Sequence, residues 1–254
     1  MELNTLSVGK ISNFSPSRGG LAISCYFSPG YRWGGGHRPI LFIGGIHGDE
    51  PEGVELALQT LVWLNSSYAS GNNSTIVVPW LLIPCINPDG YKANQRTNSN
   101  GVDLNRNFPS LDWSPNYQAP RYFPGHHPAS EPETRALVRL IMQERPRLIL
   151  HSHSWNPAIV VTGELALIDA QRLSTSSGYQ IQNDIGYPTP GSLGQFGWND
   201  CGIPVICIEE QEKSDLSVVW PNFAEGLRQI FGDDSPRKVK PEEIILATNR
   251  GANS

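Results

Sequence analysis

The sequence has little positive charge and no long apolar run, and these two absences exclude two kinds of partner. Only 19 lysine and arginine residues stand against 24 aspartate and glutamate residues, which gives a net charge of -5. Nucleic acids and anionic membrane surfaces bind to basic faces, so neither is an expected partner. The longest apolar run, residues 76–86, is broken by Pro79 and Pro84. It is too short for a membrane-spanning helix, which needs about 18 apolar residues.

Cysteines are few, and their spacing excludes a disulfide framework or a cysteine-based zinc site. Cys25, Cys85, Cys201 and Cys207 are scattered and form no CxxC pair. Cys85 and Cys207 lie in apolar runs, which is typical of buried free thiols. The first ten residues, MELNTLSVGK, include Glu2 and lack the apolar stretch of a secretory signal. The sequence therefore predicts a cytoplasmic protein.

Hydrophobic residues make up 39% of the chain, which is enough for a sizeable core, and they fall into two kinds of segment. Short apolar runs typical of buried strands are found at residues 40–44, 76–86, 148–151 and 204–208. Helical spacing of apolar residues is found at residues 52–64, 131–144, 192–199 and 218–231. Because strands alternate with helices, the sequence predicts an α/β fold with a mixed, mostly parallel twisted sheet and helices on both faces. No repeat or linker-like segment divides the chain, so residues 1–254 are expected to form a single catalytic domain.

Residues 87–128 differ from the rest of the chain, because they are rich in Asn, Arg, Pro and Gly and show little periodicity. Irregular segments of this length inside a compact domain are usually functional or disordered. The segment begins with NPDG directly after an apolar run, which predicts a turn at the carboxyl end of a strand. Ligands of open α/β sheets bind at that end, so we expect a site there.

Polar residues follow the predicted strands at several of these ends. His47 and Glu50 come after the first strand, His151 ends another, and Glu209 follows the last. Two histidines and one carboxylate leave the fourth position of a zinc ion open for water, which characterises a catalytic site. Histidine ligands also favour zinc over magnesium or calcium. The His-x-x-Glu spacing alone is a weak signal, and its position at a strand end strengthens it.

Five short sequences in a fixed order carry a resemblance to a known family. They are HGDE at 47–50, NPDG at 87–90, GVDLNRNFP at 101–109, LHSHS at 150–154 and IEE at 208–210. Together they resemble the M14 family of zinc carboxypeptidases over roughly residues 40–210. RTNSNGVDLNRNFP and YPTPGSLGQFG are similar to the murein peptide amidase A branch, which hydrolyses the γ-D-glutamyl-diaminopimelate bond of cell-wall peptides. The resemblance implies a zinc carboxypeptidase-like fold and one zinc ion per chain.

The resemblance also implies the metal ligands and the general base. It makes His47, Glu50 and His151 the zinc ligands. His153 is the rival third ligand, because residues two apart share a face of a strand, but the family places the ligand directly before a serine, as in His151-Ser152. Glu209 matches the general base that takes a proton from water and passes it to the leaving amine. The adjacent Glu210 is expected to be solvated or ion-paired on the opposite side of the strand.

The substrate-binding residues follow from the same resemblance. Asn105 and Arg106 match the pair that holds the terminal carboxylate of the substrate, for which the planar fork of arginine is suited. Arg96 matches the residue that assists the developing oxyanion, with Lys92 as the alternative. Tyr187 matches the family's mobile tyrosine, although a packed loop aromatic is the other interpretation. The polar residues 94–107 are expected to meet the distal charges of diaminopimelate.

The sequence thus predicts a zinc metallocarboxypeptidase that cleaves the γ-D-glutamyl-diaminopimelate bond of a small murein peptide. One alternative is an acyl-amino-acid deacylase of the succinylglutamate desuccinylase or aspartoacylase type, which shares HGxE and DLNR sequences. A generic zinc carboxypeptidase is another. An inactive module that only binds cell-wall peptides is disfavoured, since the metal ligands and Glu209 are all present.

Overall fold

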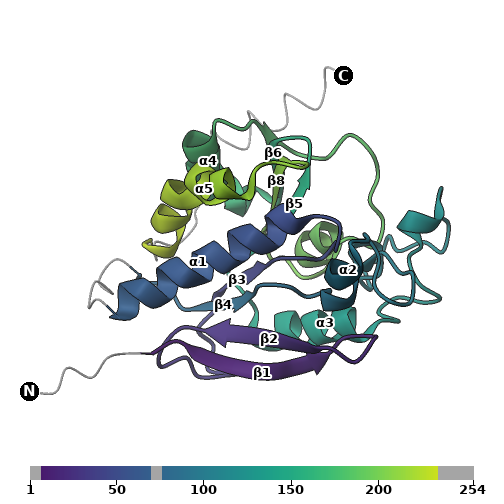
Figure 1. Cartoon of the computed structure of the whole chain (residues 1–254), viewed down its shortest axis with the longest axis horizontal. Helices are drawn as coiled ribbons and strands as arrows, with labels where there is room; N and C mark the ends of the chain where they lie inside the picture. The colour runs from purple at the N-terminus through teal and green to yellow at the C-terminus, as the bar shows by residue number, and fades with distance from the viewer. Residues whose placement is uncertain (1–6, 70–75, 234–254) are drawn as a thin grey trace, which may run out of the picture.

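The centre of the computed structural model, which describes residues 7–69 and 76–233, is an eight-stranded sheet (Figure 1). The strands lie in the order β1-β2-β4-β3-β5-β8-β6-β7. Their bounds are Gly9–Pro16, Ala22–Phe27, Ile40–Ile43, Trp80–Ile83, Leu148–Trp155, Ala158–Thr162, Ile181–Gln182 and Val205–Gln211 for β1 to β8. The four central strands β4, β3, β5 and β8 run parallel, and antiparallel neighbours flank them on both sides.

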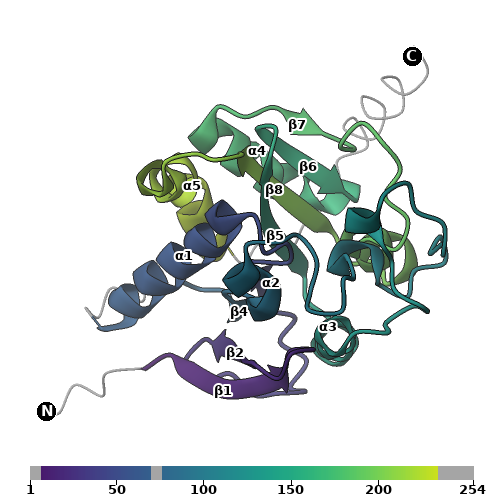
Figure 2. The same cartoon turned by 45° about the vertical axis from the view of Figure 1, so that its right-hand side comes forward.

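Helices cover both faces of this sheet, so the predicted fold class is confirmed (Figure 2). The α-helices α1 to α5 span Pro51–Ala69, Pro88–Ala93, Pro132–Glu144, Leu167–Ser177 and Leu216–Phe231. Short helices span Leu104–Arg106 (η2), Pro120–Tyr122 (η3) and Glu164–Ala166 (η4), and a π-helix spans Gln195–Asp200 (η5). One apolar core lies between the sheet and α1, α4 and α5, and the other lies between the sheet and α3. Strand β3 serves both cores, because its side chains alternate between the two faces.

Several elements differ in extent from the prediction. The predicted strand at 76–86 is reduced to β4, because Pro79 and Pro84 flank it and proline has no N–H for the ladder. The NPDG turn is in fact the start of α2, where the Asn87 side chain accepts a hydrogen bond from the N–H of Gly90 at 3.0 Å. Strand β5 continues past His151 to Trp155. The sequence patterns did not reveal β1, β2, β6, β7 or α4.

Two predictions involve residues that the structure does not describe. Residues 1–6 are part of the segment used to argue against an export signal, and residues 234–254 belong to the predicted domain of 1–254. Both lie outside the described residues. Within 7–69 and 76–233, no helix combines the length and apolar character that crossing a membrane requires.

The strand register determines which side chains meet at the carboxyl ends of the central strands. Ile43, the last residue of β3, pairs with His151 of β5. Further along, His153 of β5 pairs with Glu209 of β8. The segment that follows β3 therefore lies level with His153.

Candidate metal centre

Two histidines and a glutamate from separate parts of the chain converge beyond the end of β3. His47 Nδ1 lies 2.8 Å from Glu50 Oε1, and His153 Nδ1 lies 2.7 Å from Glu50 Oε2. The two Nδ1 atoms lie 2.9 Å apart. All three side chains are buried, and together they form a group that could hold a metal ion.

A close backbone approach positions the His47–Glu50 turn. A Cβ atom on Gly48 would lie 2.0 Å from the carbonyl carbon of Gly90 in α2, so only glycine allows the two segments to pack. Pro51 then starts α1 directly after Glu50. The HGDE sequence thus places both potential ligands on one tight turn between β3 and α1.

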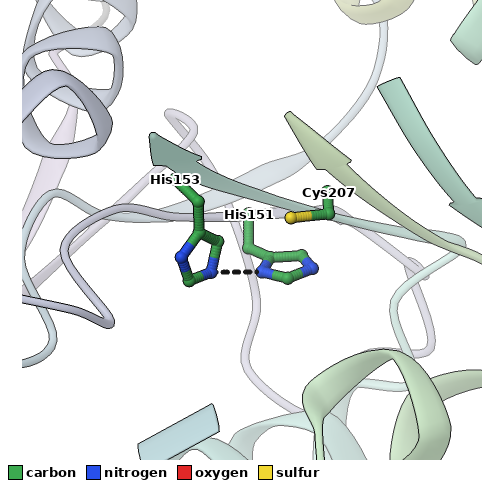
Figure 3. A group of neighbouring side chains, drawn as sticks. All are labelled: His151, His153 and Cys207. Atoms are coloured by element: carbon green, nitrogen blue, oxygen red, sulfur yellow. Dashed lines mark hydrogen bonds between the residues drawn. The ribbon is translucent and has the colours of Figure 1, made fainter. Parts of the chain in front are cut away.

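In both histidines the outer ring nitrogen, Nε2, points away from Glu50 and has its own partner. This contact bears on whether the inner nitrogen, Nδ1, carries a proton or a lone pair. His47 Nε2 lies 3.1 Å from Asp103 Oδ1. Burial would raise the pKa of Asp103, but Arg96 and His47 hold it well below its ordinary value. The Asp103 carboxylate can only accept, so His47 donates from Nε2 and its Nδ1 presents a lone pair. His153 Nε2 lies 2.9 Å from His151 Nδ1 (Figure 3). When His153 donates in this pair, its own Nδ1 presents a lone pair on the side of Glu50.

When both histidines are neutral, as metal ligands are, the group brings three acceptors together around one point: two imidazole lone pairs and a carboxylate. Such an arrangement is stable when a cation lies between the acceptors, and outer hydrogen bonds of this kind are typical of metal-binding histidines. Burial would raise the pKa of Glu50, yet positive charge on His47 and His153 and their hydrogen bonds to the carboxyl lower it well below its usual range, so Glu50 is an ionised carboxylate. A metal ion would replace those ring protons. The donor set of two nitrogens and one carboxylate fits zinc.

The third member of this group is His153, whereas the sequence analysis selected His151. The reason is the strand register. His151 pairs with the last residue of β3, while His47 and Glu50 lie beyond that strand end. His153 is on the same face of β5 but roughly 7 Å further along, at about 3.3 Å per residue, which brings its ring to theirs. The predicted strand ended at residue 151, so this difference could not be seen.

A second group of potential ligands comprises His151, His153 and Cys207, whose ligand atoms lie within 4.8 Å of one another (Figure 3). Figure 3 shows the two histidines side by side on β5, with Cys207 on the neighbouring strand β8. The Cys207 thiol lies 3.2 Å from Glu209 Oε1. Burial, together with the Glu209 carboxylate, raises the pKa of this thiol well above its ordinary value. A protonated thiol is a poor metal ligand, so the group with His47 and Glu50 is the better site.

Glu209 lies at the edge of the metal group and differs sharply from its neighbour Glu210. It lines a cavity of about 210 Å³ together with His47, Glu50 and His153. Burial, and then the Glu50 carboxylate, raise the pKa of Glu209 to about 8. Glu210 instead faces away, where it accepts hydrogen bonds from the Tyr179 hydroxyl and from Asn222 Nδ2 at 2.9 Å. Only Glu209 is placed to exchange a proton with a ligand in the cavity.

Arg96 lines the same cavity, and its guanidinium is held by two acids. Nε donates to Asp103 Oδ2 at 2.9 Å, and Nη1 lies 3.3 Å from Glu50 Oε1. Lys92 is exposed on α2 and does not belong to the cavity wall. Of the two predicted candidates for oxyanion assistance, only Arg96 is at the site.

Asn105, Arg106 and Tyr187 also line this cavity. Asn105 Oδ1 accepts a hydrogen bond from the N–H of Leu193 at 2.9 Å, and Arg106 Nη1 donates to the Asn105 carbonyl at 2.7 Å. Tyr187 stands edge-on against Trp155, with ring centroids 5.9 Å apart. The structure thus brings every predicted site residue except His151 into one cavity.

A larger adjacent cavity, of about 450 Å³, lies beside Asn105 and Glu209. His151 and Cys207 form part of its wall. Its other lining residues include Val160, Thr162, residues 183–189, Ser192, Gly194 and Gln195. Sequence analysis missed most of these, although the GSLG sequence at 191–194 was a signal.

Apart from Arg96, Asn105 and Arg106, which line the cavity, polar residues of the segment 94–107 are bonded within the protein rather than available to a ligand. Asn98 and Asn107 are fully buried. Asn98 Nδ2 donates to Glu131 Oε2 at 2.9 Å, and Asn107 Nδ2 donates to the Pro124 carbonyl at 2.8 Å. These side chains hold the long segment in place, and the larger cavity is lined mainly by residues 183–195.

Comparisons with known proteins agree with the fold and imply a zinc site. The family model described as zinc carboxypeptidase (peptidase family M14) matches residues 2–186. Murein peptide amidase A of Escherichia coli K12 is 30% identical over 167 residues, covering 61% of this chain and 64% of that protein. The protein of the same name from Vibrio campbellii is 30% identical over 183 residues, covering 66% of this chain and 68% of that protein.

Neither the alignment with the Escherichia coli K12 relative nor the family match covers the full length of the proteins. The aligned region spans slightly less than two thirds of the length of the Escherichia coli K12 relative, 64%. The family match ends at residue 186, before Tyr187 and Glu209. In fold, a murein-tripeptide amidase from Escherichia coli O157 superposes with a TM-score of 0.69 at 23% identity, over 91% of this chain and 93% of that one.

Proposed function

The chain belongs to the zinc carboxypeptidase family, and on this premise we propose that it hydrolyses the γ-D-glutamyl-diaminopimelate bond of small murein peptides with one zinc ion per chain. The observation that carries the proposal is the convergence of His47, Glu50 and His153 beside Glu209, in a cavity shared with Arg106. Similarity to murein peptide amidase A supports the choice of substrate.

In this proposal His47, Glu50 and His153 hold the metal, with His153 in place of the predicted His151. Bound zinc supplies a Lewis acid that polarises the scissile carbonyl and makes water more acidic. Asp103 and His151 accept hydrogen bonds from the outer nitrogens and so keep both ligand rings oriented.

The remaining residues divide the work of proton transfer and binding. Glu209, whose pKa is raised to about 8, takes a proton from the attacking water and returns it to the leaving amine. Arg96 faces the same cavity, where its positive charge stabilises negative charge that develops on the carbonyl oxygen. Arg106 and Asn105 hold the α-carboxylate of the leaving residue, and Tyr187 borders the reacting groups.

The larger cavity beside Asn105 fits the side chain of the leaving residue. In this proposal His151 Nδ1 accepts from His153, so its Nε2 carries the ring hydrogen and donates to a distal carboxylate. Asp184 lines the same cavity and can receive an ammonium group. Diaminopimelate carries both groups at its distal end, whereas lysine carries only the ammonium.

A panel of substrates tests the proposal with the zinc-loaded protein. We expect the highest kcat/KM for L-Ala-γ-D-Glu-diaminopimelate, a lower value for the same peptide ending in lysine, and little hydrolysis of N-acetyl-aspartate or N-succinyl-glutamate. Equal rates on the first two peptides and on an α-linked peptide would indicate a generic zinc carboxypeptidase. Preference for the acyl amino acids would indicate the deacylase alternative.

We also propose a cytoplasmic location. Support comes from the cysteines, because all four are free thiols in the structure and free thiols persist in reducing compartments. Cell fractionation with an antibody against the protein tests this, and recovery from the cell envelope would contradict it.

A further inference from the structure

We propose that Arg121 forms a second anion subsite, which binds the free α-carboxylate of a γ-linked glutamyl residue. The subsite lies on the acyl side, meaning the side of the scissile bond that carries the carbonyl. This inference rests on the proposed function and assigns the preference for a γ-linkage to a particular side chain.

Three guanidinium groups surround the ring of Tyr122. The Cζ atoms of Arg96, Arg121 and Arg106 lie 5.3, 5.5 and 5.9 Å from its centroid. All three arginines line the cavity that holds the metal group. One aromatic side chain therefore keeps three positive charges at the same cavity, which suits a ligand with more than one negative charge.

The three arginines differ in how far they are already paired. Arg96 has Asp103 and Glu50 as partners, and Arg106 donates to the Asn105 carbonyl. The nearest acid to Arg121 is Asp49, and the Nη2–Oδ2 distance of 3.7 Å is too long for a hydrogen bond. In the described part of the chain no atom accepts a hydrogen bond from Arg121, and its side chain is 56% exposed. Its five N–H donors are available to a ligand.

The position of Arg121 assigns it to the acyl side. The cavity for the leaving side chain is lined by His151 and Cys207 and does not include Arg121. Arg121 instead lies near Asp49, the residue before the ligand Glu50, and both line the cavity of the metal group but not the larger cavity. A peptide whose leaving residue fills the larger cavity must extend across the metal group toward this wall.

A γ-linked glutamyl residue places an anion at this wall for a chemical reason. Its reacting carbonyl belongs to the side chain, so its α-carboxylate remains free a few atoms further along the acyl chain. An α-linked peptide has an amide at the corresponding backbone position. The planar fork of arginine matches a carboxylate with two parallel hydrogen bonds. The acid beside Arg121 is Asp49, which would repel a carboxylate if Arg121 were absent.

A matched pair of substrates and a matched pair of variants test the subsite. The substrates are L-Ala-γ-D-Glu-diaminopimelate and the same peptide with the glutamyl α-carboxylate converted to an amide, which removes only the charge. For the zinc-loaded wild type we expect amidation to lower kcat/KM about tenfold, the size of one exposed charge-assisted contact. For Arg121→Gln we expect the two substrates to react equally, with unchanged zinc content.

Arg228 provides the control, because its environment resembles that of Arg121. It lies 5.7 Å from the ring centroid of Trp220, 3.8 Å from Glu225, and its side chain is 47% exposed, but it does not line the cavity. Arg228→Gln should keep the wild-type response to amidation. The inference is overturned if amidation leaves the wild-type rate unchanged, or if the same loss persists in Arg121→Gln. If the wild type hydrolyses neither γ-linked peptide, the proposed function itself fails and this inference fails with it.

Discussion

Two buried polar clusters, one around Glu131 and Glu133 and the other the metal group, differ in how their acceptors are paired. In the first cluster, the Glu131 carboxylate accepts hydrogen bonds from Ser130 Oγ at 2.7 Å and from Asn98 Nδ2 at 2.9 Å. Glu133 Oε1 accepts one from the N–H of Arg18 at 2.7 Å. Neutral donors satisfy these acids, and the cluster needs no further ligand.

In the metal group, by contrast, the acceptors are not all satisfied by neutral donors. His47 and His153 direct their outer N–H groups to Asp103 and His151, and their inner lone pairs face the Glu50 carboxylate. Burial is equally deep in both clusters, so burial does not distinguish them. The difference is the excess of acceptors around one point, which a cation can balance. A cluster whose acceptors all have hydrogen-bond donors stabilises the fold, whereas a cluster with an excess of acceptors indicates a binding site.

The largest expected effect concerns Glu209, the acid at the edge of the unbalanced cluster. Glu209→Gln keeps the size of the side chain but removes its basicity. We expect kcat to fall by about 100- to 10,000-fold, the usual contribution of a general base, while one zinc per chain is retained. Steady-state kinetics with zinc analysis measure both quantities.

Glu210→Gln is the matched control, because Glu210 is hydrogen-bonded to Tyr179 and Asn222 and faces away from the cavity. It should leave kcat close to the wild-type value. Loss of turnover in Glu210→Gln with full activity in Glu209→Gln would reverse the assignment of the base.

The second effect concerns the third ligand. His153→Ala should abolish stoichiometric zinc binding, because it removes one of three ligands. His151→Ala should retain zinc with about 10- to 100-fold lower affinity, as expected when only the partner of a ligand is lost. Titration against a competing chelator measures both affinities. Full zinc content in His153→Ala, with loss in His151→Ala, would restore the ligand chosen from sequence.

The sequence was sufficient to select residues at or near the carboxyl ends of the central strands, although Glu209 lies within β8 rather than after it. His47, Glu50 and Glu209 could be found because parallel strands bring their carboxyl ends to one edge of the sheet. The choice between His151 and His153 depends on where β5 ends and on its register with β3. Those features are set by pairing between distant segments, so neither spacing nor periodicity reveals them.

Other parts of the fold escaped prediction for local reasons. Strand β1 is largely exposed and has no continuous apolar run. Helix α4 contains LSTSS, whose Ser and Thr residues have low helix propensity. The contact of Asn98 with Glu131 joins residues 33 positions apart in an irregular segment, so the polar residues there looked available for a ligand although they are internally bonded.

The third effect is a pH dependence of stability after zinc has been removed with a chelator. The pKa of Glu209 is raised from 4.5 to about 8 in the folded protein, whereas the unfolded chain ionises near the ordinary value. The folded state therefore binds the Glu209 proton more tightly than the unfolded chain does. The resulting stabilisation is complete below about pH 4.5 and is lost as the pH rises through about 8. We expect the free energy of unfolding to fall by roughly 4 kcal/mol over this window. Urea titrations at several pH values measure it, and the same decline in Glu209→Gln would show that another group is responsible.

The smallest effect concerns the satisfied cluster, where Asn98→Ala removes one donor and one acceptor. Asn98 Nδ2 donates to Glu131, and its Oδ1 accepts from the N–H groups of Asn100 at 3.0 Å and Val102 at 3.1 Å. Because Glu131 keeps its bond from Ser130, we expect the free energy of unfolding to fall by only about 1–3 kcal/mol. Zinc content should stay at one per chain, since no member of the metal group contacts Asn98. Urea denaturation of the zinc-loaded protein measures the loss, with the exposed Asn116→Ala as the matched control. If Asn98→Ala released zinc while stability stayed unchanged, the two clusters would be one coupled network, and the pairing of acceptors would no longer separate a structural cluster from a binding site.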